Sequence, residues 1–207
     1  MKIIGSVKED LVREKRISIT PETVKKFTSI NISVLIEKKY AEHLGMSDEE
    51  YKNNGAVIYN SAKEVFEKAA IILRVNCPKS SEINLIKDSS ILIGQFDPLL
   101  DKEIINKLIK KKINIFSLNL LPRITRAQSM DVLSSQANLA GYKAVIDSVS
   151  EFEKAIPMMM TAAGTVTPAK VLVIGAGVAG LQAIATAKRL GAIVSATDVR
   201  VVAKEQV

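Results

Sequence analysis

The sequence contains no tryptophan, and aromatic residues make up only 4% of its 207 residues. This scarcity disfavours a protein that binds single-stranded nucleic acid, because such proteins stack the bases on aromatic side chains. The formal net charge is +7, but the lysines are scattered, and the tight run from Lys110 to Lys112 closes an expected helix, where cations favour the negative end of the dipole. We therefore expect a solvated basic surface and no nucleic-acid partner.

Cysteine and histidine are equally scarce, with one residue of each type, Cys77 and His43. A single cysteine excludes an internal disulfide framework and suits a reducing compartment. We expect Cys77 to be a small core or loop residue, and His43 to be a surface or structural residue rather than a catalytic one. We expect no metal site.

The sequence also lacks a clear targeting or membrane-spanning segment. No signal peptide is visible, because the residues after Met1 run straight into charged sequence. The uncharged stretch from Val171 to Ala187 lies at the lower edge of the length that spans a bilayer. Its three glycines are better explained by a strand followed by a helix. We therefore expect no membrane span in this chain.

The first part of the chain alternates short apolar runs with amphipathic segments that carry helix start signals. Thr20-Pro21 gives a cap followed by proline, residues 47–50 and 61–64 are S-x-x-E capping boxes, and Asp97-Pro98 opens a further expected helix. Strands alternating with helices predict a parallel sheet covered on both faces, in an α/β, flavodoxin-like first domain. The expected strands are Ile3-Ile4, Ser33 to Ile36, Val57-Ile58, Ile71 to Val75, Ile91 to Ile93 and Ile113 to Phe116.

The pattern changes after about residue 125. Ser129 to Phe152 predicts a long helix, and a segment rich in glycine and threonine follows it from Thr161 to Pro168. We therefore expect a first domain at residues 1–125, a connecting long helix at 126–160, and the first βαβ unit of a truncated Rossmann domain at 161–207. Because a Rossmann site needs further strands, we expect a fragment that has no complete reaction alone.

A glycine-rich turn follows the apolar run from Val171 to Ile174. Gly175, Gly177 and Gly180 form a G-x-G-x-x-G motif that leads into a helical segment, and the next strand ends at Asp198. In such a motif the first glycine allows the tight turn, the second lets the backbone approach a pyrophosphate, and the third lets helix and strand pack closely. The context predicts a dinucleotide site with its phosphates at the helix N-terminus. A Rossmann-type turn kept only for packing is the alternative.

Asp198 bears on the choice between NAD(H) and NADP(H). Its carboxylate should accept hydrogen bonds from the ribose hydroxyls of the adenosine, and it would repel a phosphate at the 2′ position. Arg200 complicates this prediction, since an arginine can accommodate that phosphate. We expect NAD(H) at this site.

A polar segment joins the two parts of the chain. Arg123, Gln128, Asp131 and Ser134 lie in a stretch that is dense in polar side chains beside an apolar helix. From composition alone, this stretch is equally well explained as a solvated helix start with Ser129 as the N-cap.

Two segments carry a resemblance to a known family. Residues 122–145 (PRITRAQSMDVLSSQANLAGYKAV) and 161–170 (TAAGTVTPAK) resemble the NAD(H)-binding alpha subunit of the proton-translocating transhydrogenases. The resemblance extends over the whole chain, although Arg74 stands where relatives often have lysine. The NAD(H)-binding residues expected from the resemblance and from the glycine motif are Arg123, Ile124, Thr125, Gln128, Ser129, Met130, Asp131, Ser134, Gly175, Gly177, Val178, Gly180, Asp198, Val199 and Arg200.

The resemblance also implies a function and partners. NADH bound here would pass hydride to NADP⁺ on a partner subunit, and membrane-spanning subunits would couple this step to proton translocation. It implies that the first of these residues hold the nicotinamide, and that the chain contributes no catalytic side chain. It further implies a cytoplasmic protein held at the inner face of the membrane by its partners, a homodimer, and a separate polypeptide that completes the Rossmann domain.

Two other functions remain open. An alanine-dehydrogenase-like enzyme must remove a proton along with the hydride and so needs a placed acid or base. No histidine stands around Gln95 to Asp97, where an alanine dehydrogenase would be expected to carry one. Hydride transfer between two facing nicotinamides needs only positioning, and it agrees with this absence. The other alternative is a non-catalytic remnant or interaction module that binds no nucleotide.

Overall fold

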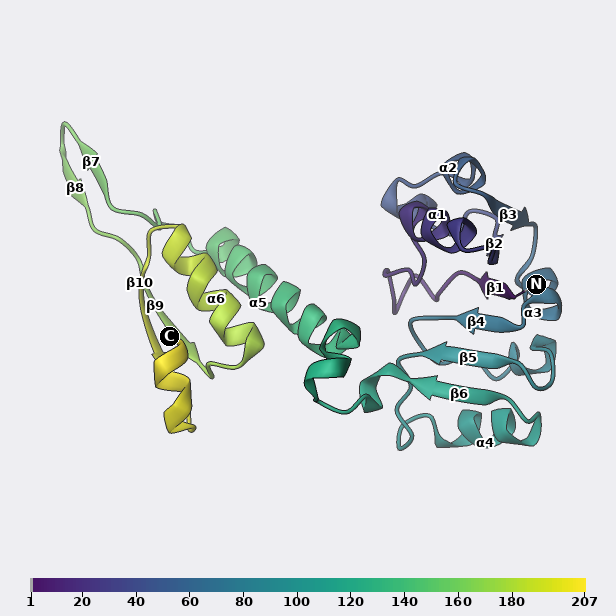
Figure 1. The fold of residues 1–207 in the computed structure, drawn as a ribbon. Helices are drawn as coiled ribbons and strands as arrows, with labels where there is room; N and C mark the ends of the chain where they lie inside the picture. Colours follow the sequence, from purple (N-terminus) through teal and green to yellow (C-terminus); the bar gives the residue numbers. More distant parts are fainter. Residues whose placement is uncertain (1) are drawn as a thin grey trace. The chain divides into compact units, whose positions relative to one another are not determined.

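The computed structural model describes residues 2–207, and the chain divides into two compact units, residues 1–130 and residues 131–207. We call these unit 1 and unit 2 and describe each by itself (Figure 1). Both contain strands and helices that alternate along the chain, so the predicted α/β class is confirmed.

Unit 1 is organised around a six-stranded sheet in the order β3-β2-β1-β4-β5-β6. All neighbouring strands in this sheet pair in parallel, as the sequence predicted. The order reverses between β1 and β4, so the carboxyl ends of these two strands form the switch point of the sheet. The strands are β1 (Ile3–Ser6), β2 (Ser33–Glu37), β3 (Ala56–Tyr59), β4 (Ile71–Leu73), β5 (Ile91–Gly94) and β6 (Asn114–Ser117).

The α-helices of unit 1 begin at the predicted capping residues, with one exception. Thr20 Oγ1 accepts a hydrogen bond from the Thr23 N–H at 3.2 Å. Both capping boxes, which begin at Ser47 and Ser61, form their reciprocal hydrogen bonds. The helices are α1 (Pro21–Ser29), α2 (Asp48–Asn53), α3 (Ala62–Lys68) and α4 (Lys102–Lys110).

The exception is the helix predicted to open at Asp97-Pro98, which begins instead at Lys102. The Asp97 carboxylate accepts hydrogen bonds from the Leu99 N–H at 2.8 Å and the Leu100 N–H at 3.2 Å. These bonds close a local turn in place of a first helical turn. As a result Leu99 and Leu100 are 87% and 85% exposed and do not contribute to an apolar helix face.

Two apolar cores lie on opposite faces of this sheet, because successive side chains of a strand point to opposite faces. In β2, Leu35 belongs to the same core as Phe66 of α3. Its neighbours Val34 and Ile36 belong to the other core, together with Val24 of α1. The helices therefore cover both faces of the sheet, which is the arrangement that alternating strands and helices predict.

Cys77 packs at the border of the core that contains Leu35 and Phe66. The thiol is half-buried, and this burial raises the pKa of Cys77 to about 12. The thiol therefore stays protonated at neutral pH and behaves as a small apolar group. The prediction of a small core or loop residue is confirmed.

Unit 2 begins with a long helix and ends in a strand–helix–strand unit. The N-cap of the long helix is Asp131, whose carboxylate accepts the Ser134 N–H at 2.9 Å, so the alternative with Ser129 as the cap is wrong. The helix packs against α6 at Gly141, where a Cβ would lie 2.0 Å from Ala179 O. The elements are α5 (Val132–Glu151), β7 (Met159–Thr161), β8 (Gly164–Val166), β9 (Lys170–Ile174), α6 (Val178–Arg189) and β10 (Ile193–Thr197).

Strands β9 and β10 pair in parallel and are joined by α6. Gly191 follows the end of α6 with a φ of +89°, and its N–H donates to Lys188 O at 3.0 Å. The Ala192 N–H donates to Ala187 O at 3.1 Å, which completes a Schellman motif. The predicted glycine stop for this helix is therefore confirmed.

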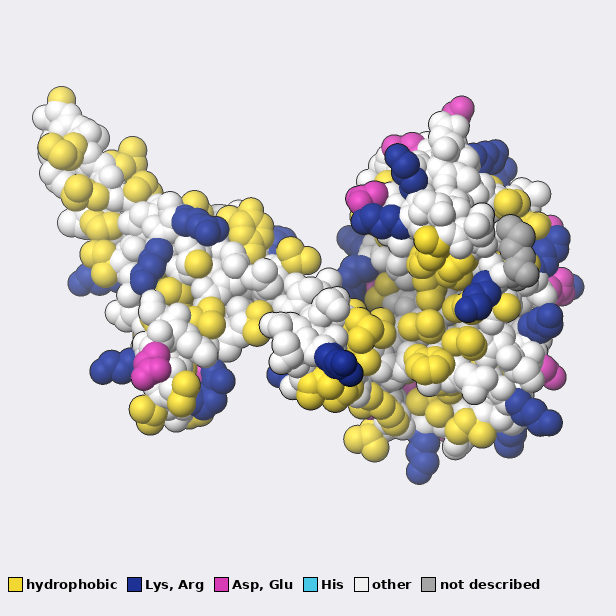
Figure 2. All heavy atoms as spheres, in the orientation of Figure 1, with side chains coloured by type: hydrophobic (Ala, Val, Ile, Leu, Met, Phe, Trp, Pro, Cys, Tyr) yellow, Lys and Arg dark blue, Asp and Glu magenta, His cyan; other side chains and the backbone are white. Residues whose placement is uncertain are grey.

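The segment rich in glycine and threonine forms an antiparallel hairpin, β7–β8, which the sequence did not predict. Its strand residues are exposed throughout. Met160 is 81% exposed and the preceding Met158 is 60% exposed, and Figure 2 shows hydrophobic side chains gathered over this hairpin at the upper left. An apolar surface of this kind is typical of a site that another protein covers.

Short 3₁₀ helices complete both units. Within residues 2–207, no helix has both the length and the apolar character needed to cross a membrane. The 3₁₀ helices are η1 (Glu42–Leu44), η2 (Ile83–Leu85), η3 (Leu118–Leu120) and η4 (Thr125–Met130) in unit 1, and η5 (Val201–Gln206) in unit 2.

Candidate functional site

The glycine-rich turn joins β9 to α6 at the carboxyl end of the parallel strand pair in unit 2. Gly175 has a φ of +95°, which side chains strongly disfavour, and its N–H donates to Thr197 O at 2.7 Å. A Cβ on Gly180 would lie 1.8 Å from Gly175 O, so glycine is required for α6 to pack this closely. No atom beyond the adjacent residues lies within 4 Å of the Cβ position of Gly177. This part of the turn therefore leaves room for a ligand to approach the backbone.

The N-terminus of α6 lies directly after this turn. Gly177 is its N-cap and provides no side-chain hydrogen bond. The N–H groups of the first helical turn therefore remain available to an anion, and the helix dipole favours negative charge there. Val178, the first residue of the helix, is 46% exposed beside the same opening. These features suit the binding of a pyrophosphate.

Asp198 follows β10 and turns its carboxylate toward the glycine turn. Its Oδ2 accepts the Ala176 N–H at 2.7 Å, and its Oδ1 accepts the Arg200 N–H at 2.8 Å. The Arg200 guanidinium completes an ion pair, with Nε 3.0 Å from Oδ1. Hydrogen bonds from the Arg200 side chain, the Arg200 N–H and the Ala176 N–H together hold the pKa of Asp198 far below its ordinary value. The carboxylate is therefore charged at any physiological pH.

A pocket of about 470 Å³ opens beside Asp198. Its volume lies within the range that small-molecule and cofactor sites occupy. Both strands of the pair and the last 3₁₀ helix contribute to its walls, so the pocket combines backbone, apolar and charged surface. The lining residues are Ala176, Ala196, Thr197, Asp198, Arg200, Val201, Ala203, Lys204 and Val207.

The structure brings part of the expected residue set together in unit 2. Gly175, Gly177 and Gly180 form the turn, and Asp198 and Arg200 lie beside it. Val199, which was also expected to contact the nucleotide, has a fully exposed side chain.

The remaining expected residues belong to the end of unit 1 and the start of unit 2. The residues from unit 1 lie in or next to η4 and are exposed, while Ala127 is buried in the same segment. In unit 2, Asp131 accepts hydrogen bonds from the Ser134 N–H at 2.9 Å and from Ser134 Oγ at 2.6 Å. Whether these residues bind the nicotinamide remains a prediction of the resemblance. The residues from unit 1 are Arg123, Ile124, Thr125, Gln128, Ser129 and Met130.

Some residues of this site were not predicted from the sequence. Ala176 is 1% exposed and supplies the N–H that fixes Asp198, yet as the second residue of the motif it is formally unrestricted. Lys204 and Ala203 line the pocket from η5, a segment without a recognisable signal. The small side chain at Ala176 was the one feature in the sequence that hinted at close packing.

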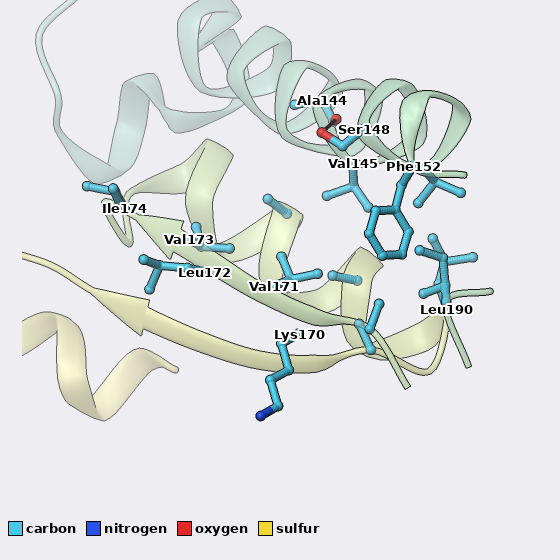
Figure 3. Close-up of a pocket in the computed structure, with 16 residues that line it drawn as sticks. Ala144, Val145, Ser148, Phe152, Lys170, Val171, Leu172, Val173, Ile174 and Leu190 are labelled. Carbon is cyan, nitrogen blue, oxygen red and sulfur yellow. Dashed lines mark hydrogen bonds between the residues drawn. The ribbon is translucent and has the colours of Figure 1, made fainter. Parts of the chain in front are cut away.

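A second cavity in unit 2, of about 340 Å³, lies between α5, α6 and β9 (Figure 3). Val145 and Phe152 of α5 point into it, and the ammonium of Lys170 points away from it. All residues of β9 line this cavity, which indicates that it follows the strand edge not paired with β10. Its apolar lining, with few polar groups to orient a small molecule, suits a protein segment better than a nucleotide.

Charged side chains fill the switch point of the sheet in unit 1. The Arg74 side chain is 2% exposed and forms ion pairs with Glu9 at 3.1 Å and Glu82 at 2.7 Å. Arg16 is paired in a similar way with Glu14 at 2.7 Å. Both arginines are therefore engaged by carboxylates of the protein itself.

His43, the sole histidine, lies in η1. Its Nε2 lies 2.7 Å from Lys15 O, so the ring joins two segments of unit 1. The position near Gln95, where a dehydrogenase of the rival type would be expected to carry a histidine, contains a glutamine whose Oε1 accepts a bond from Arg16 at 3.4 Å. The expectation of a structural His43 agrees with this geometry.

Comparison with known protein families matches both parts of the chain. Residues 5–140 match the family described as alanine dehydrogenase/PNT, N-terminal domain. Residues 144–207 match the family described as alanine dehydrogenase/PNT, C-terminal domain.

Individual relatives agree with these matches. The chain is 48% identical to a protein of the NAD(P) transhydrogenase alpha subunit from Rhodospirillum rubrum, over 99% of this chain and 54% of that protein. The crystal structure of a transhydrogenase from Sinorhizobium meliloti is 48% identical and superposes with a TM-score of 0.93, covering 99% of this chain and 61% of that one. An L-alanine dehydrogenase structure is 23% identical with a TM-score of 0.82, covering 98% and 56%, and shows a shared fold. The chain thus spans about half the length of the curated relative.

Proposed function

The chain belongs to the alanine dehydrogenase/PNT family, and from that premise we propose that it is the NAD(H)-binding component of a transhydrogenase. In the complete enzyme, hydride passes from NADH on this component to NADP⁺ on a partner subunit. The step is coupled to proton translocation across a membrane. The chain alone binds NAD(H) but completes no reaction.

One observation carries this proposal most directly. Asp198 is fixed beside the glycine turn by the Ala176 N–H at 2.7 Å, and a pocket of about 470 Å³ opens next to it. The carboxylate suits the ribose hydroxyls of NAD(H), while the free N–H groups of α6 suit its pyrophosphate. A negative charge at this position disfavours the 2′-phosphate of NADP(H).

The chemistry of the described residues favours transhydrogenation over amine oxidation. A dehydrogenase must place an acid or base at the reacting carbon, but His43 is bound to Lys15 O and Gln95 occupies the rival position. Hydride transfer between facing nicotinamides needs only correct positioning of the two rings. The higher identity to transhydrogenases, 48% against 23% for the alanine dehydrogenase structure, supports the same choice.

The nicotinamide end of the cofactor is held by the segment that joins the two units. Arg123 and Gln128 of unit 1 bind the nicotinamide carboxamide and neighbouring groups, together with Asp131 and Ser134 of unit 2. The resemblance of this segment to the transhydrogenase family supports the assignment. The Asp131 carboxylate, already oriented by Ser134 at 2.6 Å, is a ready acceptor for an amide.

Three kinds of protein partner follow from this function. NADP(H)-binding and membrane-spanning subunits hold the component at the cytoplasmic, inner face of the membrane. A further polypeptide completes the Rossmann domain, which is supported by the open edge of β9 and the apolar cavity beside it. A second copy of the chain forms a homodimer, and the exposed methionines of the β7–β8 hairpin, including Met160, support such an interface.

A fluorescence titration of NADH into the 207-residue chain, with NADPH as the comparison, tests the proposal. We expect saturable binding of NADH and binding of NADPH that is weaker by about tenfold or more, because the 2′-phosphate meets Asp198. Asp198→Asn should weaken NADH binding by about tenfold, since a charged acceptor is lost. Asp147→Asn, which changes an exposed carboxylate on α5, is the matched control and should bind normally. Absence of saturable binding for both nucleotides would contradict the proposal.

A further inference from the structure

The Asp198 carboxylate is fully occupied by hydrogen-bond donors of the protein itself. A carboxylate has about four lone-pair positions on its two oxygens. Oδ1 accepts from the Arg200 N–H at 2.8 Å and from Arg200 Nε at 3.0 Å. Oδ2 accepts from the Ala176 N–H at 2.7 Å and from Arg200 Nη2 at 3.1 Å. A ligand that needs Asp198 as an acceptor must therefore displace one of these donors.

The donors differ in how readily they can leave. Ala176 is 1% exposed, and its N–H would lose its partner inside the protein, which is costly. The Arg200 N–H is likewise part of the backbone turn that places Asp198. The Arg200 side chain is 59% exposed, so water replaces its hydrogen bonds when it turns away. The guanidinium is therefore the donor that a ligand displaces most easily.

The guanidinium also lies across the mouth of the strand pair. Its Nη2 is 3.3 Å from Ala176 O, so it spans from Asp198 to the glycine turn. Both residues line the pocket of about 470 Å³. The side chain thus occupies the part of the pocket where a ribose would meet the carboxylate.

Resting on the proposed function, we propose that Arg200 is a specificity-determining residue that covers Asp198 and competes with the ribose hydroxyls of NAD(H). The nucleotide binds after the guanidinium has turned away. Because exposed ion pairs are weak, the competition lowers the affinity for NAD(H) by only about twofold to fivefold.

The same competition affects the preference between the two nucleotides. While the pair is closed, the positive charge of Arg200 offsets the negative charge of Asp198, which reduces the repulsion of a 2′-phosphate. Without Arg200, the bare carboxylate binds the ribose hydroxyls more strongly and repels the phosphate more strongly. Arg200 therefore narrows the preference of the site for NADH over NADPH.

Calorimetric titration of the full chain and of Arg200→Met with two probes tests this inference. Adenosine 5′-monophosphate carries the ribose hydroxyls, and 2′,3′-dideoxyadenosine 5′-monophosphate lacks them. We expect Arg200→Met to bind the first probe about twofold to fivefold more tightly and the second probe unchanged. The ratio of NADH to NADPH affinity should rise in the same variant. Arg200→Lys, which keeps the charge but not the planar donor pair, should fall between the two.

Lys204→Met is the matched control, because Lys204 lines the same pocket. Within residues 2–207, no hydrogen bond or ion pair joins it to Asp198. We expect this variant to weaken both probes equally, as the loss of a general positive charge should.

The outcomes separate the inference from the proposed function. If the unmodified chain binds NADH but Arg200→Met binds both probes equally or more weakly, the inference is overturned and the function stands. If Arg200→Met binds NADH and the unmodified chain does not, the inference is supported in its strongest form. If neither protein binds any nucleotide, both are overturned.

Discussion

Among single residues, Arg74 carries the most deeply buried charge of unit 1. Its guanidinium is 2% exposed and joins Glu9, which is 4% exposed, to Glu82. Arg74→Met should destabilise the chain by about 3–5 kcal/mol, because it leaves the Glu9 carboxylate buried without a partner. Arg74→Lys should lose less, about 1–3 kcal/mol, since an ammonium keeps the charge but not the forked geometry. Urea unfolding of the three proteins measures the order, and equal stability of the two variants would contradict it.

Glu14 gives stability a pH dependence. Two hydrogen bonds from Arg16, at 2.9 Å and 2.7 Å, lower the pKa of Glu14 from 4.5 to about 2. Because the folded pKa is the lower one, the pair stabilises the fold fully above about pH 4.5 and loses this effect as the pH falls toward 2. Arg16 is 41% exposed, so we expect a difference of only about 1 kcal/mol.

The difference between the full chain and Glu14→Gln in unfolding free energy at pH values on both sides of this range measures the effect. It should shrink as the pH falls. Glu22→Gln, which removes an exposed pair with Lys26, is the control and should change little. A Glu14→Gln penalty that stays constant with pH would show that the ion pair is not its cause.

How far the candidate site could be predicted also depends on single residues. The glycines and Asp198 were predictable, because backbone geometry and a strand end restrict which residues work there. The contact between Arg200 and Asp198 was not, since it depends on the rotamer of a long side chain, and sequence alone raised only the question of the 2′-phosphate. Ala176 was missed because its contribution is a backbone N–H, which every residue except proline has.

At the scale of elements, the crossing of α5 and α6 is sensitive to one methyl group. A Cβ at Gly141 would lie 2.0 Å from Ala179 O, a distance that forces the helices apart. Gly141→Ala should therefore destabilise unit 2 by about 1–3 kcal/mol, which outweighs the gain of roughly 0.5–1 kcal/mol that alanine brings to a helix interior. Ser135→Ala on the exposed side of α5 is the control and should be neutral or slightly stabilising. Thermal unfolding followed by circular dichroism gives both values, and a stabilised Gly141→Ala would refute the close crossing.

The elements themselves show where sequence reasoning succeeds. The boxes at Ser47 and Ser61 were predictable, because each requires two residues at fixed spacing that satisfy one another. Asp97-Pro98 misled, because an aspartate can close a turn as well as start a helix, and the turn prevailed. The β7–β8 hairpin was missed because its strands are three residues each and have no buried face, so no alternation of apolar residues marks them.

At the scale of the whole molecule, the two units differ in their buried cores. Unit 1 has two core clusters on a six-stranded sheet, whereas unit 2 has a strand pair with apolar side chains such as Ile174 that are largely exposed. Unit 2 should therefore open first and exchange its amide hydrogens faster than unit 1. NADH at a hundredfold excess over its dissociation constant should slow exchange in β9, α6 and β10 by up to about 2.7 kcal/mol of protection.

Hydrogen exchange with and without NADH, followed by mass spectrometry, measures this difference. Strands β1 to β3 of unit 1 provide the internal control and should be unchanged. Uniform protection of both units without nucleotide would contradict the predicted difference in stability.

Strand β9 pairs with β10 along one edge, and within residues 2–207 its other edge has no strand beside it. Leu172 and Ile174 of this strand are 64% and 81% exposed. An apolar strand with an open edge is a template for pairing with an identical strand, which is the first step toward cross-β aggregates. The solubility of the chain in a cell therefore depends on timing, because β9 must be covered by its partner polypeptide, or shielded by a chaperone, before two copies meet.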